Sequence, residues 1–140
     1  MEPVNAFKTI FRLRFRDQDV IGHANNAVYF TFFEDVRADF LREHNLDFND
    51  PDIFFILAKI GCEFKKPIVY NFNDPYVAIY INCFEIGEKS FKFRYTVTDN
   101  KDTSLVHAIG ESVQVCFDPK AGRAVQVSEK FKKILGRYTG

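Results

Sequence analysis

The sequence predicts an α+β fold in which one antiparallel sheet covers one long helix. Over most of the chain, apolar and polar residues alternate with a period of two, which is typical of half-buried strands. From about residue 26 to residue 44, apolar residues instead recur at steps of three and four, which is typical of an amphipathic helix. Short turn sequences separate most of the strand segments, and strands joined by tight turns pair antiparallel.

The first strand is expected over residues 7–15, where alternate residues from Phe7 to Phe15 share one face. A polar, turn-prone stretch over residues 17–23 then leads into the helix. Asn25 or Asn26 can cap the start of this helix, because an asparagine side chain accepts a bond from a free first-turn amide. About 19 residues at 1.5 Å each give a helix roughly 28 Å long, which we expect at the centre of the core.

Four further strands are expected at about residues 56–64, 77–84, 91–98 and 104–117, with a short final helix at 129–135 capped by Ser128. Gly110 lies within the last of these strands and is expected to mark a bulge or kink. A regular strand at the edge of a sheet is open to pairing with another chain. The pattern therefore favours a dimer with a continuous sheet.

Length and composition exclude several classes of protein. The 140 residues fit a single domain spanning 1–140, and 19 basic residues balance 19 acidic ones, so no broad positive field for nucleic acid is expected. The apolar runs are too short to span a bilayer, and the N-terminus lacks the pattern of a signal peptide. Three widely spaced cysteines argue against a disulfide framework and favour the cytoplasm. The three histidines show no metal-ligand spacing, so no metal site is expected.

Asp19 is the candidate catalytic residue, because it lies on the loop just before the helix begins. The first amides of a helix lack intrahelical partners and carry partial positive charge, so they can polarise a carbonyl. A nearby carboxylate can then activate water or attack the carbonyl directly. A thioester suits this chemistry without a metal or a cofactor. On residue chemistry alone, a simple capping role for Asp19 is the more common alternative.

The segment from Asp17 to Tyr29, continued by Phe33-Glu34 and Arg37, resembles the 4-hydroxybenzoyl-CoA thioesterase branch of the hotdog superfamily. Its pattern, D-x-D-x-x-G-H-x-N-N-x-x-Y-x-x-x-F-E-x-x-R, is met at every specified position. The run Phe64-Lys65-Lys66-Pro67 looks like the family segment between the second and third strands. The resemblance covers nearly the whole chain.

This resemblance implies a hotdog fold, a five-stranded antiparallel sheet wrapped around one long central helix, in homodimers that often pair into homotetramers. It implies hydrolysis of acyl-CoA at the dimer interface, with Asp19 as the catalytic carboxylate and the backbone of Asn26 as the oxyanion donor. Coenzyme A enters as part of the substrate, so no separate cofactor is implied. Two other functions stay open: a non-catalytic acyl-CoA binding module, and a hotdog dehydratase or hydratase.

The resemblance also implies a set of substrate-binding positions: Gly22, His23, Asn25, Tyr29, Glu34, Lys65 and Lys66. Gly22 allows a sharp turn, and His23 is expected to order the loop. A related thioesterase branch takes its catalytic carboxylate from the helix position of Glu34, but here we expect Glu34 to pair with Arg37 three residues on. The candidates for holding the phosphates of coenzyme A are basic residues: Lys59, Lys65, Lys66, Lys89 and Arg94. For any single one of them, a solvated position on a strand face or turn is the more common alternative.

Overall fold

The computed structural model describes residues 2–47 and 49–140 of the chain. The strands are β1 (Phe7–Arg12), β2 (Phe55–Phe64), β3 (Tyr76–Ile86), β4 (Ser90–Asp99), β5 (Val106–Asp118) and β6 (Arg123–Ala124). The α-helices are α1 (Asn26–Glu43) and α2 (Glu129–Leu135), and short 3-10 turns occur at Phe15–Asp17 and Gly136–Tyr138. None of the helices in the described residues is long and apolar enough to cross a membrane.

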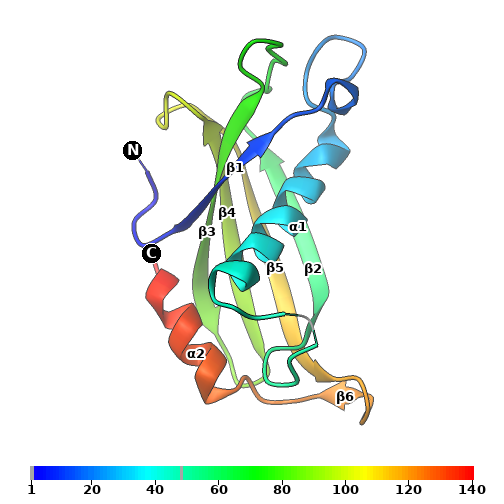
Figure 1. Ribbon diagram of the computed structural model, residues 1–140, viewed down its shortest axis with the longest axis vertical. Helices are drawn as coiled ribbons and strands as arrows, with labels where there is room; N and C mark the ends of the chain where they lie inside the picture. The colour runs from blue at the N-terminus through cyan, green and yellow to red at the C-terminus, as the bar shows by residue number, and fades with distance from the viewer. Residues whose placement is uncertain (1, 48) are drawn as a thin grey trace.

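All strand pairs are antiparallel, and the strands lie side by side in the order β1-β3-β4-β5-β2, with β6 added beside β5 (Figure 1). Strands β3, β4 and β5 follow one another through tight turns, as the sequence predicts. By contrast, β2 pairs with β5 and not with β3, which comes next in the chain. An apolar pattern with a period of two identifies a strand, but it does not show which distant strand pairs with it.

The sheet curves around α1, which lies against its concave face as the hotdog arrangement requires (Figure 1). Asn25 caps α1, because its Oδ1 accepts a hydrogen bond from the amide of Ala27 at 3.0 Å. The helix ends at Glu43, followed by His44 as C-cap and by Asn45 with a positive φ of 56°. The apolar face of α1 is buried under the sheet: Val28, Tyr29, Phe32, Phe33, Val36, Phe40 and Leu41. The predicted central helix is therefore confirmed within one residue at each end.

The first strand is shorter than predicted. It ends at Arg12, and the chain turns at Phe15–Asp17. The carboxylate of Asp17 accepts hydrogen bonds from the amide of Arg14 at 2.8 Å and from its guanidinium at 3.0 Å, which bends the backbone away from the sheet. As a result, Phe15 is 72% exposed although it follows the apolar alternation.

The predicted bulge at Gly110 is wrong. Gly110 pairs regularly with Cys62 and Tyr95, whereas the ladder irregularities lie at other positions of the sheet. The position requires glycine for a different reason, since a Cβ atom there would lie 2.6 Å from the ring of Phe33. That ring stacks on Tyr95 with 4.3 Å between centroids, so Gly110 lets α1 approach the sheet closely.

Candidate functional site

Two loops meet at one end of the molecule, the β1–α1 loop and the β2–β3 loop (Figure 1). The amide of Ala24 donates to the carbonyl of Ile68 at 2.8 Å, and the amide of Tyr70 donates to the carbonyl of Gly22 at 2.9 Å. His23 forms an isolated antiparallel bridge with Val69 between these two bonds. Gly22 has a φ of 81°, a value that L side chains rarely adopt, so the predicted sharp turn at this glycine is present.

The carboxylate of Asp19 is fixed by its own loop. Its Oδ1 accepts hydrogen bonds from the amides of Ile21 and His23, each at 3.0 Å. Its backbone amide donates to the carbonyl of His23 at 2.6 Å, which closes the turn. No hydrogen bond within residues 2–47 and 49–140 reaches the second oxygen, Oδ2. One oxygen therefore anchors the side chain, and the other is available to a substrate or a water molecule.

The start of α1 presents a free amide beside this carboxylate. The amide of Asn25 donates to the carbonyl of Asp17 at 2.8 Å, and Asn25 in turn accepts from Ala27 and Val28. Among the described residues, no group accepts a hydrogen bond from the amide of Asn26. This N–H lies at the positive end of an 18-residue helix, where it can stabilise negative charge on a ligand oxygen.

A pocket of about 210 Å³ connects these groups. It is lined by Asp19, His23, Ala24, Asn26, Tyr29, Phe64, Lys65, Lys66 and Pro67. Tyr29 comes from the first turn of α1, and its ring meets that of Phe64 edge to face at 4.9 Å between centroids. The pocket therefore sets one carboxylate and one free amide beside an aromatic wall, with basic residues at its side.

Tyr29 in the pocket wall and the neighbouring Cys62 both stay protonated at neutral pH. Burial, and to a smaller extent the nearby Cys62 thiol, raise the pKa of Tyr29 to about 12. Burial likewise raises the pKa of Cys62 to about 11, so this thiol is a poor nucleophile. Among the residues that line the pocket, Asp19 is the one carboxylate, and Lys65 pairs with Glu63 at 2.7 Å outside it. Asp19 is therefore the candidate acid–base group among the carboxylates near the pocket.

Residues 13–135 match the family model of the thioesterase-like superfamily. The chain belongs to this superfamily. The chain is 25% identical over 141 residues to the uncharacterized protein YsmA of Bacillus subtilis, covering 95% of this chain and 91% of that protein. The thioesterase assignment agrees with the resemblance carried by residues 17–37, and the chain is a thioester hydrolase of the hotdog fold.

Solved structures have the same fold. A predicted thioesterase from Bacillus stearothermophilus superposes with a TM-score of 0.83 at 22% identity, covering 96% of this chain and 97% of that one. A thioesterase from Thermus thermophilus, solved in complex with coenzyme A and Zn, superposes with a TM-score of 0.76 at 25% identity, covering 91% of this chain and 95% of that one. The hotdog fold predicted from the sequence is confirmed.

The pocket at the start of α1 brings together most of the predicted site positions but not all of them. Gly22 and Asn25 line an adjoining open groove on the other side of the loop, which Asp19 also borders. Glu34 is exposed on α1 and lines neither hollow. The predicted pairing of Glu34 with Arg37 is wrong, because Arg37 is buried and donates to the hydroxyl of Tyr95 at 2.8 Å.

Phe64 and Pro67 were not among the predicted site positions, although both line the pocket at the start of α1. Both belong to the run that extends the family resemblance, so the sequence signal was present. In the sequence, Phe64 fits the alternating pattern of a strand and has no other distinguishing feature. In the structure it lies at the end of β2 and is 45% exposed. Only the meeting of β2 with the first turn of α1 makes Phe64 part of the site.

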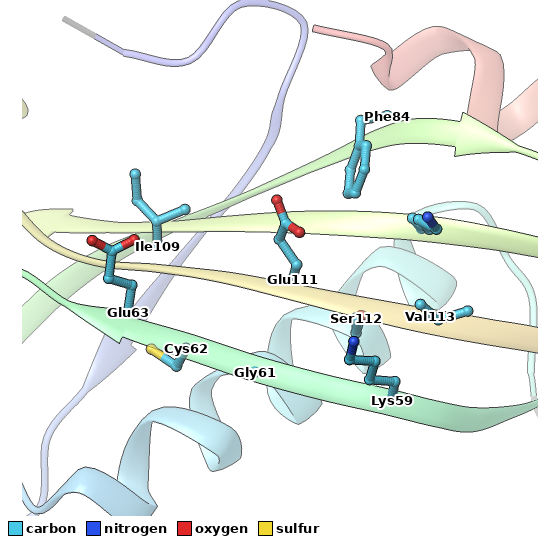
Figure 2. A pocket seen from close by; sticks show the side chains of 10 residues that line it. Lys59, Gly61, Cys62, Glu63, Phe84, Ile109, Glu111, Ser112 and Val113 are labelled. Carbon is cyan, nitrogen blue, oxygen red and sulfur yellow. The ribbon is translucent and has the colours of Figure 1, made fainter.

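Another hollow, of about 430 Å³, lies on the outer face of the sheet, away from α1 (Figure 2). Lys59, Glu63 and Glu111 lie around it, and neither Asp19 nor Asn26 contributes to it. Within the described part of the chain, no three His, Cys, Asp or Glu side chains are placed to hold a metal ion. The smaller pocket at the start of α1 is therefore the candidate active site on chemical grounds.

Proposed function

We propose that this thioesterase hydrolyses acyl-CoA in the pocket between Asp19 and Asn26. The observation that carries the proposal is the meeting of a fixed carboxylate that has one free oxygen with a free helix N-terminal amide. Coenzyme A as the thiol partner is supported by the Thermus thermophilus relative, which was solved with coenzyme A. The three cysteines form no disulfides, which favours a cytoplasmic location.

In the proposed reaction, the carbonyl oxygen of the thioester accepts a hydrogen bond from the Asn26 amide. Asp19 then acts by one of two routes. As a base, its Oδ2 takes a proton from water while the water oxygen bonds to the carbonyl carbon. As a nucleophile, Oδ2 itself bonds to that carbon, and water later cleaves the resulting anhydride. In both routes the C–S bond breaks, coenzyme A leaves as a thiolate that gains a proton, and one water is consumed.

The remaining pocket residues are assigned to substrate binding. Tyr29 and Phe64 form the apolar wall beside the thioester, and His23 orders the loop through its backbone bonds to Asp19. Lys65 and Lys66 lie at the side of the pocket, where they are placed to meet the phosphates of coenzyme A. Gly22 and Asn25 shape the loop and the helix start. We assign Glu34 a position that faces the substrate only in the assembled dimer.

An acyl-CoA hydrolysis panel tests this proposal. Thiol release from aliphatic and aromatic acyl-CoA substrates is expected, with the free acid as the second product. Binding of acyl-CoA without turnover would instead identify a binding module. Hydration of an enoyl-CoA with the thioester intact would identify a dehydratase. A single turnover in ¹⁸O-labelled water identifies a nucleophilic route in which water attacks the Asp19 carbon of the anhydride, because the product then carries an unlabelled Asp19 oxygen and Asp19 gains the label.

We further propose that the active form is a homodimer, or a homotetramer built from it, joined through the free edge of β2. β2 is the last strand in the sheet order, and no strand among the described residues pairs with its outer edge. Ile56, Leu57 and Phe64 on this strand are each 43–45% exposed, and Phe30 of α1 is 38% exposed. A second β2 paired antiparallel would bury these side chains and complete both sheets into one.

The charges on β2 favour one register for the proposed pairing. Lys59, Gly61 and Glu63 alternate along the outer face of the sheet, with the two charged residues on either side of the glycine (Figure 2). A two-fold axis at Gly61 sets each Lys59 opposite the partner's Glu63. Lys59→Glu and Glu63→Lys are each expected to weaken the dimer, and the double exchange is expected to restore it. Sedimentation equilibrium measures this, and additive losses in the double variant would refute the register.

A further inference from the structure

We propose that His107 is a positioning residue for the thioesterase site, and this inference rests on the proposed function of that site. His107 lies on β5, is only 5% exposed and does not line the pocket. It acts on the Lys65–Pro67 wall, which does line the pocket, and through that wall on the loop that carries Asp19. His107 lies outside the motif of residues 17–37, and its hydrogen bonds go to the backbone of Lys65 and Lys66 and not to Asp19 or Asn26.

His107 fixes the peptide groups of the wall from several directions. Its carbonyl oxygen accepts hydrogen bonds from the amides of Lys65 at 2.8 Å and Lys66 at 3.1 Å. Its ring Nδ1 lies 3.1 Å from the carbonyl oxygen of Lys66. A carbonyl oxygen can only accept, so Nδ1 carries the hydrogen in this bond. Lys66 is therefore held through both its amide and its carbonyl group, and the carbonyl contact depends on the imidazole side chain.

The wall in turn holds the catalytic loop. Two residues after Lys66, the carbonyl of Ile68 accepts from the amide of Ala24 at 2.8 Å, two residues before Asn26. The amide of Tyr70 donates to the carbonyl of Gly22. His23, which lies between Gly22 and Ala24 in the chain, donates its amide to the carboxylate of Asp19. Hydrogen bonds, together with the short stretches of backbone between them, thus connect His107 through residues 65–70 to the carboxylate and the free amide. Loss of the ring contact releases the first member of this set.

Two amide substitutions separate positioning from general core packing. In His107→Asn, the side-chain NH₂ lies about where Nδ1 lies, so the bond to the Lys66 carbonyl is kept. In His107→Gln, the donor lies one bond farther out, near the place of Nε2, and the carbonyl loses its partner. We expect kcat/KM for acyl-CoA to fall by about 5- to 100-fold in His107→Gln and to stay within about threefold of wild type in His107→Asn.

Gln114→Met is the matched control, because it removes a buried side-chain donor from the same strand. Gln114 donates to the carbonyl of Phe91 at 3.3 Å and lines no part of the pocket. It is expected to lower the melting midpoint, as His107→Gln does, but to leave kcat/KM within about threefold of wild type. Equal activity losses in Gln114→Met and His107→Gln would overturn the proposal, since both would then report only on stability.

Amide hydrogen exchange supplies a readout that does not depend on activity. Exchange over residues 19–26 and 65–70 is expected to quicken in His107→Gln but not in His107→Asn or Gln114→Met. If wild type hydrolyses no acyl-CoA, the proposed function fails, and the exchange pattern still decides the role of His107. If His107→Gln does not fold, the exchange rate of His107→Asn over residues 19–26 and 65–70 decides. A rate equal to that of wild type supports the proposal, and a faster rate overturns it.

Discussion

Replacing Asp19 by Asn is the sharpest test of the proposed chemistry, because the structure separates the two roles of this side chain. Oδ1 anchors the loop by accepting from the amides of Ile21 and His23, and Oδ2 is free. An asparagine carbonyl oxygen can accept both of these bonds in the same place. Its NH₂ group, however, stands where the free oxygen was, and it can neither take a proton nor attack a carbonyl carbon.

The expected stability loss is small, because both anchoring bonds persist and lose only their charge assistance. At about 0.5–1 kcal/mol for each bond, the total is about 1–2 kcal/mol. The loss of a general base lowers kcat by about 10²- to 10⁴-fold, or about 3–5 kcal/mol of transition-state stabilisation. Stopped-time hydrolysis of the best acyl-CoA substrate and thermal melting of the same preparation measure the two effects. A kcat within about threefold of wild type, with a clear loss of stability, would show that Asp19 only caps the loop and would refute this mechanism.

Two further predictions concern stability. Gly110→Ala is expected to lower the unfolding free energy by about 1–3 kcal/mol, because its Cβ would meet the Phe33 ring at 2.6 Å. Gly136→Ala is the control, since no atom lies within 4 Å of a Cβ there, and equal urea midpoints for the two variants would contradict the packing argument. Burial, and then the charge of Arg137, lower the pKa of His44. At pH values below the usual histidine pKa of about 6.5, the folded state therefore binds fewer protons than the unfolded state. Stability should therefore fall as the pH drops through about 6.5, and His44→Gln should flatten this dependence in urea titrations at several pH values; unchanged slopes would count against it.

The fold could be predicted from the sequence where the signal is local. The steps of three and four along α1, and the asparagine at its start, gave its limits to within one residue. Ser128 likewise marked the start of α2, where its hydroxyl accepts from the amide of Phe131 at 3.2 Å. The pairing of β2 with β5 could not be predicted, because it joins segments some fifty residues apart through contacts that leave no periodic trace.

Phe15 and Gly110 show how local patterns mislead. The alternation of apolar residues continues through Phe15, yet the carboxylate of Asp17 forms bonds with Arg14 that turn the chain before that point. At Gly110, the general link between glycine and bulges in strands failed because the missing side chain makes room for a ring from another element. In both cases a specific tertiary or side-chain contact outweighed a statistical preference.

The candidate site shows the same division between local and non-local information. The turn from Asp19 to His23 closes through bonds within five residues, so a sequence motif can specify it almost completely. What the motif leaves open is where that turn sits relative to Phe64 and the Lys65–Pro67 wall. This relation depends on the bonds from Ile68 and Tyr70 to the loop, and on the buried contact of His107 with Lys66. In the proposed mechanism a thioester meets the carboxylate, the amide and this wall at once, so residues outside the motif would decide whether the motif can act.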